Sequence, residues 1–291
     1  MSRAQPAEGH AIDLDYLRTW IGRESVSEDT LSVRHARLMA ATLGLPQTQF
    51  TVGTPLPPLW HWLYFLEGLP PAELGRDGHP ARGGFLPPVP LENRMWAGGR
   101  LEFHAPVALG RTVRKRSTVT SVEHKRGRSG NLVFVTVRHD ILDGDTVAIT
   151  EDHDIVYRQP APPGTARATV AEMPTPSHSE RFEATSTMLF RYSALTFNGH
   201  RIHYDVDYCR NVEGYSNLVV HGPLQATLLA DLATRLGTRP LRQFRYRGVQ
   251  PNLLGTPLTI NAAPSGDGMT LWTAQPDGTV SMQAETVFQS A

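Results

Sequence analysis

One segment near the C-terminal end predicts a helix that is apolar on most of its faces. It spans residues 221–236, HGPLQATLLADLATRL, with Pro223 in the first turn, where proline is tolerated, and Gly237 directly after its end. Leucines spaced four residues apart form one stripe, and small alanines lie beside it: Leu224, Leu228, Leu232, Leu236, Ala226, Ala230 and Ala233. Such a helix belongs in a protein core. The rest of this half of the chain must therefore enclose it.

An internal repeat indicates what surrounds the helix. Residues 106–110 (PVALG) and 251–255 (PNLLG) share the pattern Pro-x-x-Leu-Gly, and each leads into a strand-like segment. Later in each half, an Asp-Gly turn at 143–144 or 277–278 comes before a Thr-Val segment. We therefore predict that each half is one long helix followed by an antiparallel meander, with the first helix in the apolar segment 57–67.

The first half also predicts two earlier helices and several strands. Apolar residues at helical spacing predict helices over 12–21 and 29–43. The buried side of the second helix should hold Leu31, Leu38, Met39 and Thr42. Segments rich in Val, Thr, Phe and Ile predict strands over 101–106, 111–123, 131–142 and 146–157.

A proline-rich segment of low apolar content divides the chain. Residues 159–180, QPAPPGTARATVAEMPTPSHSE, predict a linker. We therefore predict an N-terminal half over 1–158 and a C-terminal half over 181–291.

Three features of the first half allow a functional and a structural interpretation. His61 lies among aromatic residues and is either a ligand contact or, as we favour, a core or edge histidine that is satisfied by the backbone. The irregular segment 68–99 either shapes the mouth of a binding tunnel or is a surface excursion, and both remain open. A basic hairpin favours a solvated strand surface over a phosphate contact: Arg111, Arg114, Lys115, Arg116, Lys125, Arg126 and Arg128.

Composition excludes some classes of function. Lys and Arg together number 28, as do Asp and Glu, so the zero net charge argues against a nucleic-acid-binding protein. The single cysteine, Cys209, allows no intramolecular disulfide and fits a reducing compartment. The N-terminal residues lack the apolar core of a secretory signal, and no apolar run is long enough to span a bilayer. We expect a cytoplasmic protein that binds neither membrane nor nucleic acid.

Residues 189–226 bring a polar turn close to the start of the apolar helix. The turn runs from Asn198 to Asp205, NGHRIHYD, and the helix opens with His221-Gly222-Pro223. The first N–H groups of a helix have no internal partner and favour negative charge, so this stretch predicts the functional site.

The same residues resemble a known motif. Thr-Phe-Asn-x-x-x-Ile-His-x-Asp over 196–205, followed by Val-His-Gly-Pro-Leu over 220–224, is similar to the hydratase motif of MaoC-like hot-dog enzymes. The resemblance is strongest to the branch of type 2 hydroxyacyl-thioester dehydratases and mesaconyl-C4-CoA hydratases. It implies an α+β double hot-dog fold, with a curved antiparallel sheet wrapped around a buried helix in each half and continuous between the halves.

The first half lacks this motif, so we predict one active site per chain, with the first half contributing part of the substrate tunnel. We further predict a homodimer.

The resemblance also implies a chemistry. In the family, an acidic residue and a histidine five positions later hold the water that adds to an enoyl thioester, while backbone N–H groups at the helix start stabilise the enolate oxygen. Here the histidine is His203, but the acidic position holds Asn198, which cannot take a proton. The proton transfer then falls to His203 alone or is shared with Asp205, His200 or His221. The resemblance implies no metal and no cofactor beyond the coenzyme A of the substrate.

Each of the other motif residues allows a functional and a structural interpretation. For Asn198 we favour positioning of water or thioester over turn formation, and for Gly222 an oxyanion donor over a helix-start residue only. His221 is equally compatible with capping and catalysis. Arg201 could bind a carboxylate on the acyl group through bidentate geometry or face solvent in the turn.

The remaining site candidates are substrate-binding residues. His200 belongs to the motif turn, and Tyr192 and Tyr215 could line the pocket, although core packing is the safer interpretation. Arg245 and Arg247 alternate with aromatic residues on a predicted strand, where a surface position is favoured over contact with the coenzyme A phosphates.

We expect a hydro-lyase (EC 4.2.1 type) that hydrates an enoyl-CoA or dehydrates a 3-hydroxyacyl-CoA. A short branched or dicarboxylic acyl group, such as mesaconyl, itaconyl or citramalyl, is favoured. The alternatives are a fatty-acid 3-hydroxyacyl-thioester dehydratase, a hot-dog acyl-CoA thioesterase, and a non-catalytic acyl-thioester binding protein.

Overall fold

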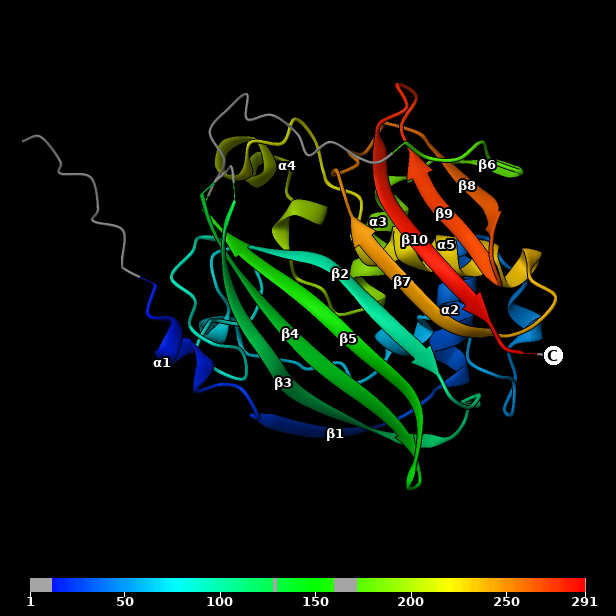
Figure 1. Ribbon diagram of the computed structural model, residues 1–291, viewed down its shortest axis with the longest axis horizontal. Coiled ribbons are helices and arrows are strands. Elements are labelled where there is room, and N and C mark those ends of the chain that lie inside the picture. Colours follow the sequence, from blue (N-terminus) through cyan, green and yellow to red (C-terminus); the bar gives the residue numbers. More distant parts are fainter. Residues whose placement is uncertain (1–11, 128–129, 160–171, 291) are drawn as a thin grey trace, which may run out of the picture.

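The computed structural model describes residues 12–127, 130–159 and 172–290, and it is built on one antiparallel sheet (Figure 1). The sheet has ten strands in the order β1-β3-β4-β5-β2-β7-β10-β9-β8-β6. The strands are β1 (Glu24–Thr30), β2 (Asn93–Phe103), β3 (Thr112–Gly127), β4 (Gly130–Asp143), β5 (Thr146–Arg158), β6 (His178–Phe182), β7 (Leu241–Gly248), β8 (Leu258–Ser265), β9 (Gly268–Ala274) and β10 (Val280–Phe288).

The helices are fewer and lie mainly behind the sheet in the view of Figure 1. They are α1 (Leu14–Arg18), α2 (Val33–Leu43), α3 (Ser186–Leu195), α4 (Val206–Tyr208) and α5 (Gly222–Leu236). Short helical turns are η1 (Gln47–Gln49), η2 (Trp60–Leu63), η3 (Pro71–Glu73), η4 (Arg201–His203) and η5 (Cys209–Glu213).

The strand order confirms the predicted repeat and the predicted continuous sheet. Outward from the β2–β7 seam the order is β5-β4-β3-β1 on one side and β10-β9-β8-β6 on the other, so each half repeats the same arrangement. Two isolated bridges, Pro55 with Ala108 and Val219 with Leu253, also correspond. Each of them ties one Pro-x-x-Leu-Gly segment to the residues just before the expected central helix.

The second half encloses its helix as predicted. Helix α5 packs against β7, β8, β9 and β10. Its fully buried residues include Leu224, Ala226, Leu229, Ala230, Leu232 and Ala233. Leu228 and Leu236 of the predicted stripe are only partly buried. The helix ends at Gly237, where a Cβ atom would lie 2.4 Å from the Phe288 ring.

The predicted long helix of the first half is wrong. Residues 57–67 form only the short turn η2, because Leu59 and Phe65 on either side of it have positive φ angles of 68° and 59°. The apolar run signals burial without fixing the periodicity. Its aromatic rings instead pack individually, as Trp60 does against Phe50 with ring centroids 5.0 Å apart.

The predicted helix over 29–43 is also partly wrong. Its first residues belong to strand β1, which the sequence analysis did not predict, and α2 begins only at Val33. Leu31, Met39 and Thr42 are buried as predicted, but Leu38 is 46% exposed. Helix α1 occupies only the middle of the predicted segment 12–21, and β2 begins before the predicted strand 101–106. Strands β3, β4 and β5 match their predictions within a few residues.

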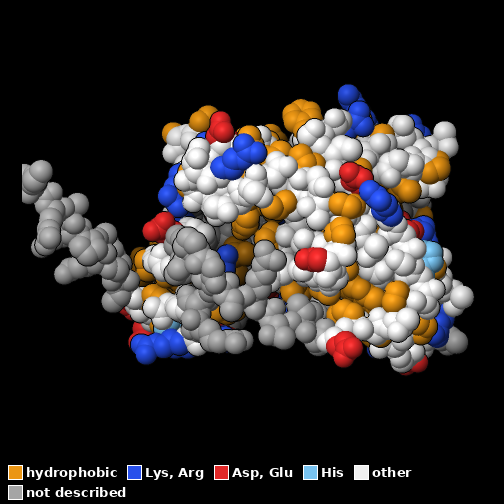
Figure 2. Space-filling view, turned by 90° about the horizontal axis from the view of Figure 1, so that it is seen from above, with side chains coloured by type: hydrophobic (Ala, Val, Ile, Leu, Met, Phe, Trp, Pro, Cys, Tyr) orange, Lys and Arg blue, Asp and Glu red, His pale blue; other side chains and the backbone are white. Residues whose placement is uncertain are grey.

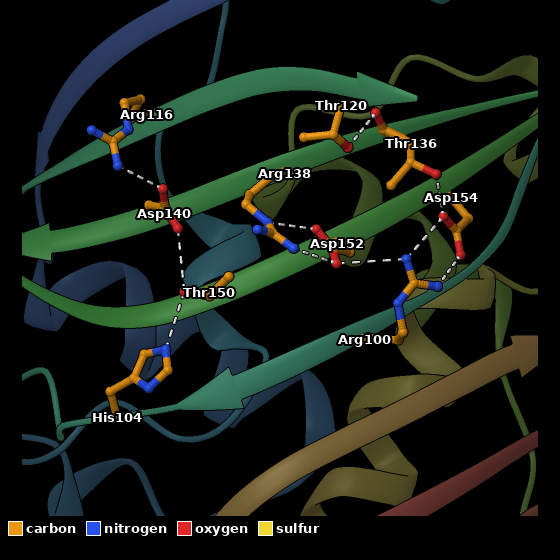
Figure 3. A network of polar contacts seen from close by, with 10 residues as sticks. All are labelled: Arg100, His104, Arg116, Thr120, Thr136, Arg138, Asp140, Thr150, Asp152 and Asp154. Carbon is orange, nitrogen blue, oxygen red and sulfur yellow. Dashed lines mark hydrogen bonds and ion pairs between the residues drawn. The ribbon is translucent and has the colours of Figure 1, made fainter. Parts of the chain in front are cut away.

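Most of the basic residues of the β3–β4 hairpin face outward, and Arg111, Arg114 and Arg116 pair with aspartates. Arg116 lies 2.8 Å from Asp140 on the neighbouring strand, and Arg138 lies 2.8 Å from Asp152. Figure 3 shows this network continuing across the outer face to Arg100 and Asp154. These pairs support the interpretation of a solvated strand surface. Lys115 differs, because strand alternation turns it to the inner face with Val113 and Ser117.

Most of the predicted linker, together with Arg128 of the basic hairpin, lies outside the described residues, and β6 begins at His178. The predicted boundaries of the two halves remain predictions. Among the described residues, no helix is long and apolar enough to cross a membrane.

The packing of α5 makes a stability prediction. Leu229→Ala should lower the free energy of unfolding by about 2–5 kcal/mol, because a fully buried side chain leaves a cavity. Leu38→Ala, on the half-exposed side of α2, is the matched control and should cost less than about 1 kcal/mol. Urea unfolding followed by circular dichroism measures both. Equal losses would contradict the assignment of α5 as the core helix.

Candidate functional site

A cavity of about 1970 Å³ opens between the two halves. It exceeds the roughly 300–1,000 Å³ typical of small-molecule pockets. Its wall includes the inner faces of β2 to β5, the motif turn and the start of α5, so both halves contribute, as predicted. Much of the irregular segment 68–99 also lines it, which favours the tunnel interpretation of that segment. Hydrophobic side chains gather beside a hollow on the face seen in Figure 2.

His203 is held at the cavity wall by the turn η4. The chain leaves α3 through Phe197, whose φ of 47° redirects the backbone into the motif. His203 Nδ1 lies 2.8 Å from the Val219 carbonyl oxygen, so this nitrogen donates and Nε2 keeps its lone pair. Burial, followed by the neighbouring imidazoles, lowers the pKa of His203 to about 3. The ring is therefore neutral at physiological pH, and its Nε2 lone pair can accept a hydrogen bond from water.

The His221 ring packs against the His203 ring. The two rings stack with centroids 3.6 Å apart, and His221 Nε2 lies 2.8 Å from Ser193 Oγ. His221 is fully buried and makes no side-chain capping bond, although it occupies the N-cap position of α5. Burial and then His203 hold the pKa of His221 well below its ordinary value. The geometry gives it a structural contact to His203, and a part in catalysis remains a prediction.

Gly222 begins α5 and lines the cavity. A Cβ atom here would lie 2.8 Å from a ring carbon of Trp96, so only glycine allows this close approach. The first N–H groups of a helix lack acceptors within the helix. Pro223 has no backbone N–H and cannot donate a hydrogen bond. The Gly222 N–H therefore lies at the cavity wall, and its role as an oxyanion donor remains a prediction.

Asn198 forms the turn that one of its two predicted interpretations describes. Its Oδ1 accepts a hydrogen bond of 2.9 Å from the His200 backbone N–H, which makes it a turn former. It also lines the cavity beside His203. Its role in positioning water remains a prediction.

Two residues that the sequence analysis missed lie next to the motif. His79 and Asp77 come from the irregular segment of the first half, and Asp77 Oδ2 lies 3.0 Å from His79 Nδ1. The His79 ring is 4.2 Å from the ring of His200, which is itself 5.4 Å from His203. The only sequence signal was an Asp-Gly-His turn inside a segment assigned no structure. Ligand atoms of Asp77, His79 and His200 lie within 4.8 Å of one another, so these residues could hold a metal ion.

Arg201 and Asp205 are engaged with each other. Arg201 Nη2 lies 2.7 Å from Asp205 Oδ2, and the guanidinium stacks 4.3 Å above the Tyr208 ring. Neither residue belongs to the described wall of the cavity. A role for Arg201 in binding the acyl carboxylate remains a prediction, and this ion pair would have to open for it.

The other predicted binding residues differ in position. Tyr192, Tyr215 and His200 line the cavity, and Tyr192 is also buried in the core. Arg247 lines the cavity and is exposed, as expected at its mouth. Arg245 is exposed on β7 opposite Glu285 and away from the described cavity wall.

A second polar cluster, which the sequence analysis did not predict, lies on the inner face of the first half. Strand register aligns Ser117, His139 and Glu151 across β3, β4 and β5. Glu151 is 2% exposed and lies 2.8 Å from His61 Nε2. His61 is therefore a paired core histidine, but its partner is a carboxylate and not the backbone that we predicted. His61, His139, Glu151, His153 and Lys115 all line the cavity. Burial alone would raise the pKa of Glu151. The hydrogen bond and charge of His61, and to a smaller extent the other histidines, lower this pKa instead.

Comparisons with known proteins agree with this geometry. The sequence profile of the family described as hydroxyacyl-thioester dehydratase type 2 matches residues 59–254. A mesaconyl-C(4)-CoA hydratase of Chloroflexus aurantiacus is 44% identical over 268 residues, covering 91% of this chain and 95% of that protein.

Solved structures show the fold. A MaoC-like dehydratase of Phytophthora capsici superposes with a TM-score of 0.72 at 15% identity, covering 96% of this chain and 98% of its own. A Mycobacterium tuberculosis protein described as a double hotdog fold superposes with a TM-score of 0.53 at 16% identity, covering 91% and 95%. The predicted α+β double hot-dog fold is confirmed.

The buried imidazoles predict a strong dependence of stability on pH. Burial lowers the pKa below the ordinary 6.5 for six histidines: His79, His139, His153, His200, His203 and His221. Below that value the unfolded chain binds more protons than the folded one, so the free energy of unfolding should fall as pH drops from about 6.5 to 4. Each group contributes up to about 1.4 kcal/mol per pH unit.

Urea unfolding at a series of pH values measures this loss. His139→Gln should make the dependence shallower, since it removes one such group. A free energy of unfolding that stays constant between pH 7 and 5 would contradict the prediction.

Proposed function

The chain belongs to the hydroxyacyl-thioester dehydratase type 2 family and is a hydro-lyase, and we propose that it adds water to the double bond of a short dicarboxylic enoyl-CoA. Mesaconyl-C4-CoA is the first candidate substrate, because the relative at 44% identity is named for its hydration. Itaconyl-CoA, and citramalyl-CoA in the reverse direction, are related candidates. The observation that carries the reaction class is the juxtaposition of a neutral His203 and the free N-terminus of α5 at one cavity wall.

These groups can perform the steps of hydration. His203 Nε2 takes a proton from water as the water oxygen bonds to the β-carbon. The electrons of the double bond move toward the thioester, whose oxygen becomes enolate-like and accepts a hydrogen bond from the Gly222 N–H. The thioester carbonyl re-forms when the α-carbon takes a proton. In this proposal Asn198 holds the water through its amide.

The first-half polar cluster supports a small, polar acyl group. Lys115 faces the cavity, and among the described residues no carboxylate oxygen lies within 4.0 Å of its ammonium group. Burial lowers the pKa of Lys115, which Glu151 and other carboxylates partly offset. A long alkyl chain would desolvate these charges without compensation, whereas a carboxylate could pair with Lys115.

The proposal also covers the binding of the coenzyme A part of the substrate, the need for a cofactor, the location and the oligomeric state. Arg247, and at the surface Arg245, are the basic residues proposed to face the coenzyme A phosphates. No separate cofactor is needed, because coenzyme A arrives with the substrate. We also propose a cytoplasmic location and a homodimer, the former supported by the single cysteine.

A fatty-acyl substrate on acyl carrier protein is the second candidate. The size of the cavity favours it, since about 1970 Å³ exceeds what a short acyl group fills. The charged inner wall of the first half argues the other way.

Turnover of candidate thioesters tests the reaction. Mesaconyl-, itaconyl-, crotonyl- and longer enoyl-CoAs should be incubated with the protein and followed by mass spectrometry. We expect a gain of one water, and a fall of kcat by about 10²–10⁴-fold in His203→Ala. Release of free coenzyme A would indicate a thioesterase instead, and binding without turnover would indicate a binding protein.

The acyl class has its own test. Lys115→Met should lower kcat/KM for the dicarboxylic thioester by about 10–100-fold, the loss expected for one charge-assisted hydrogen bond. Crotonyl-CoA, which has no second carboxylate, should change by less than about 3-fold. Arg116→Met, the outward neighbour on β3, is the matched control and should affect neither substrate. An equal loss on both thioesters would argue against Lys115 as a carboxylate ligand.

A further inference from the structure

The active site lacks an acidic group at the motif position that carries one in related enzymes. Asn198 stands there, and Asp205 is paired with Arg201 outside the described cavity wall. We propose that Asp77 and His79 of the first half replace it, with His79 as a second proton-transfer group and Asp77 as its positioning residue. The role of His79 rests on the proposed hydration, whereas its pairing with Asp77 does not.

The geometry of the pair is that of an oriented acid–base dyad. Asp77 Oδ2 lies 3.0 Å from His79 Nδ1, and Asp77 Oδ1 accepts the His79 backbone N–H at 3.0 Å. The carboxylate therefore fixes Nδ1 as the protonated nitrogen and leaves the Nε2 lone pair free. Both residues line the cavity.

The loop that carries the dyad is fastened to the motif turn. The Arg201 backbone N–H donates to the Asp77 carbonyl oxygen at 2.9 Å. Gly78 has a φ of +86°, and a Cβ atom there would lie 2.0 Å from the Gly199 carbonyl oxygen. Only glycine permits this approach, so the loop of one half and the motif of the other are held as one unit. His79 is therefore placed by backbone contacts, as a group that transfers protons must be.

His79 differs from the three imidazoles of the motif and the α5 start, those of His200, His203 and His221, in what stabilises its charged form. His203 donates to a carbonyl and His221 contacts a serine hydroxyl, while the His200 ring contacts that of His79 at an interplanar angle of 46°. Among these four rings of the described chain, His79 alone has a carboxylate within hydrogen-bond distance. The charged groups that act on it are Asp77, which favours its imidazolium, and Arg94 of β2, which opposes it; the His200 ring lies beside it.

The His200 ring lies between the two proton-transfer groups, with its centroid 5.4 Å from that of His203 and 4.2 Å from that of His79. In hydration, His203 takes a proton from water as the C–O bond forms at the β-carbon. The proton is exchanged through water in the cavity, and His79 takes one up as an imidazolium that the Asp77 carboxylate stabilises. His79 gives it to the α-carbon as the thioester carbonyl re-forms, so one water is added and every imidazole returns to its neutral form.

Substitutions in the loop test this assignment. Asp77→Asn should lower kcat by about 10–100-fold and His79→Ala by about 10²–10³-fold, with KM for the thioester within about 3-fold of its starting value. Added imidazole should partly restore His79→Ala. Glu73→Gln, an acid-to-amide change at an exposed position of the same loop, is the matched control and should leave kcat unchanged.

A titration that does not depend on turnover separates the dyad from the proposed reaction. The His79 imidazole, followed by NMR in the intact protein, should show a lower pKa in Asp77→Asn than in the unchanged chain. An unchanged His79 pKa, or kcat values within 2-fold in both variants, would overturn the proposal. So would loss of activity without imidazole rescue, or a stoichiometric metal ion that is lost in Asp77→Asn and whose removal by chelators abolishes turnover. Absence of hydration by the unchanged chain would overturn the proposed function and with it the role of His79, while the titration would still decide the pairing with Asp77.

Discussion

The pairing of β2 with β7 is the interaction on which the rest of the molecule depends. Five residue pairs, from Gly98 with Arg247 to Glu102 with Gln243, join two sheets into one. The seam requires glycine, because a Cβ atom at Gly99 would lie 2.3 Å from the Tyr246 hydroxyl. On its inner side Trp96 stacks on Tyr246 at 4.5 Å, and the same Trp96 ring packs against Gly222. Backbone pairing of the halves thus fixes where the helix N-terminus meets the cavity.

Space for a substrate follows from an asymmetry across that seam. In the second half α5 fills the concave side of the sheet, while the corresponding segment of the first half is the short turn η2. The first-half strands are longer, with 16, 14 and 13 residues in β3, β4 and β5 against 8, 7 and 9 in β8, β9 and β10. The inner face left without a long helix carries side chains that line the cavity, including Glu151 and Lys115.

The features that the sequence predicted correctly depend mainly on residues close together in the chain. Helix α5 follows from its own composition and from its flanking proline and glycine. The repeat predicted an antiparallel meander in each half, the family resemblance implied the continuous sheet, and the motif brought His203 and Gly222 to one wall. The failures involve long-range effects. Burial of the segment 57–67 was evident, but its backbone conformation is set by the positive φ of Leu59 and by packing partners distant in sequence. Asp77 lies far along the chain from the motif that it contacts, so no spacing rule could have found it.

The unequal halves also bear on how such a site can change over time. In a symmetric pair of identical subunits, every substitution occurs twice, so a helix removed to widen one pocket is removed from both subunits. Joining the halves in a single chain releases that constraint, since each position then mutates once. One half can keep the helix N-terminus that the reaction uses, while the other loses its long helix and its sheet lines the substrate cavity. The width of the pocket and the machinery of the reaction have become separately adjustable properties.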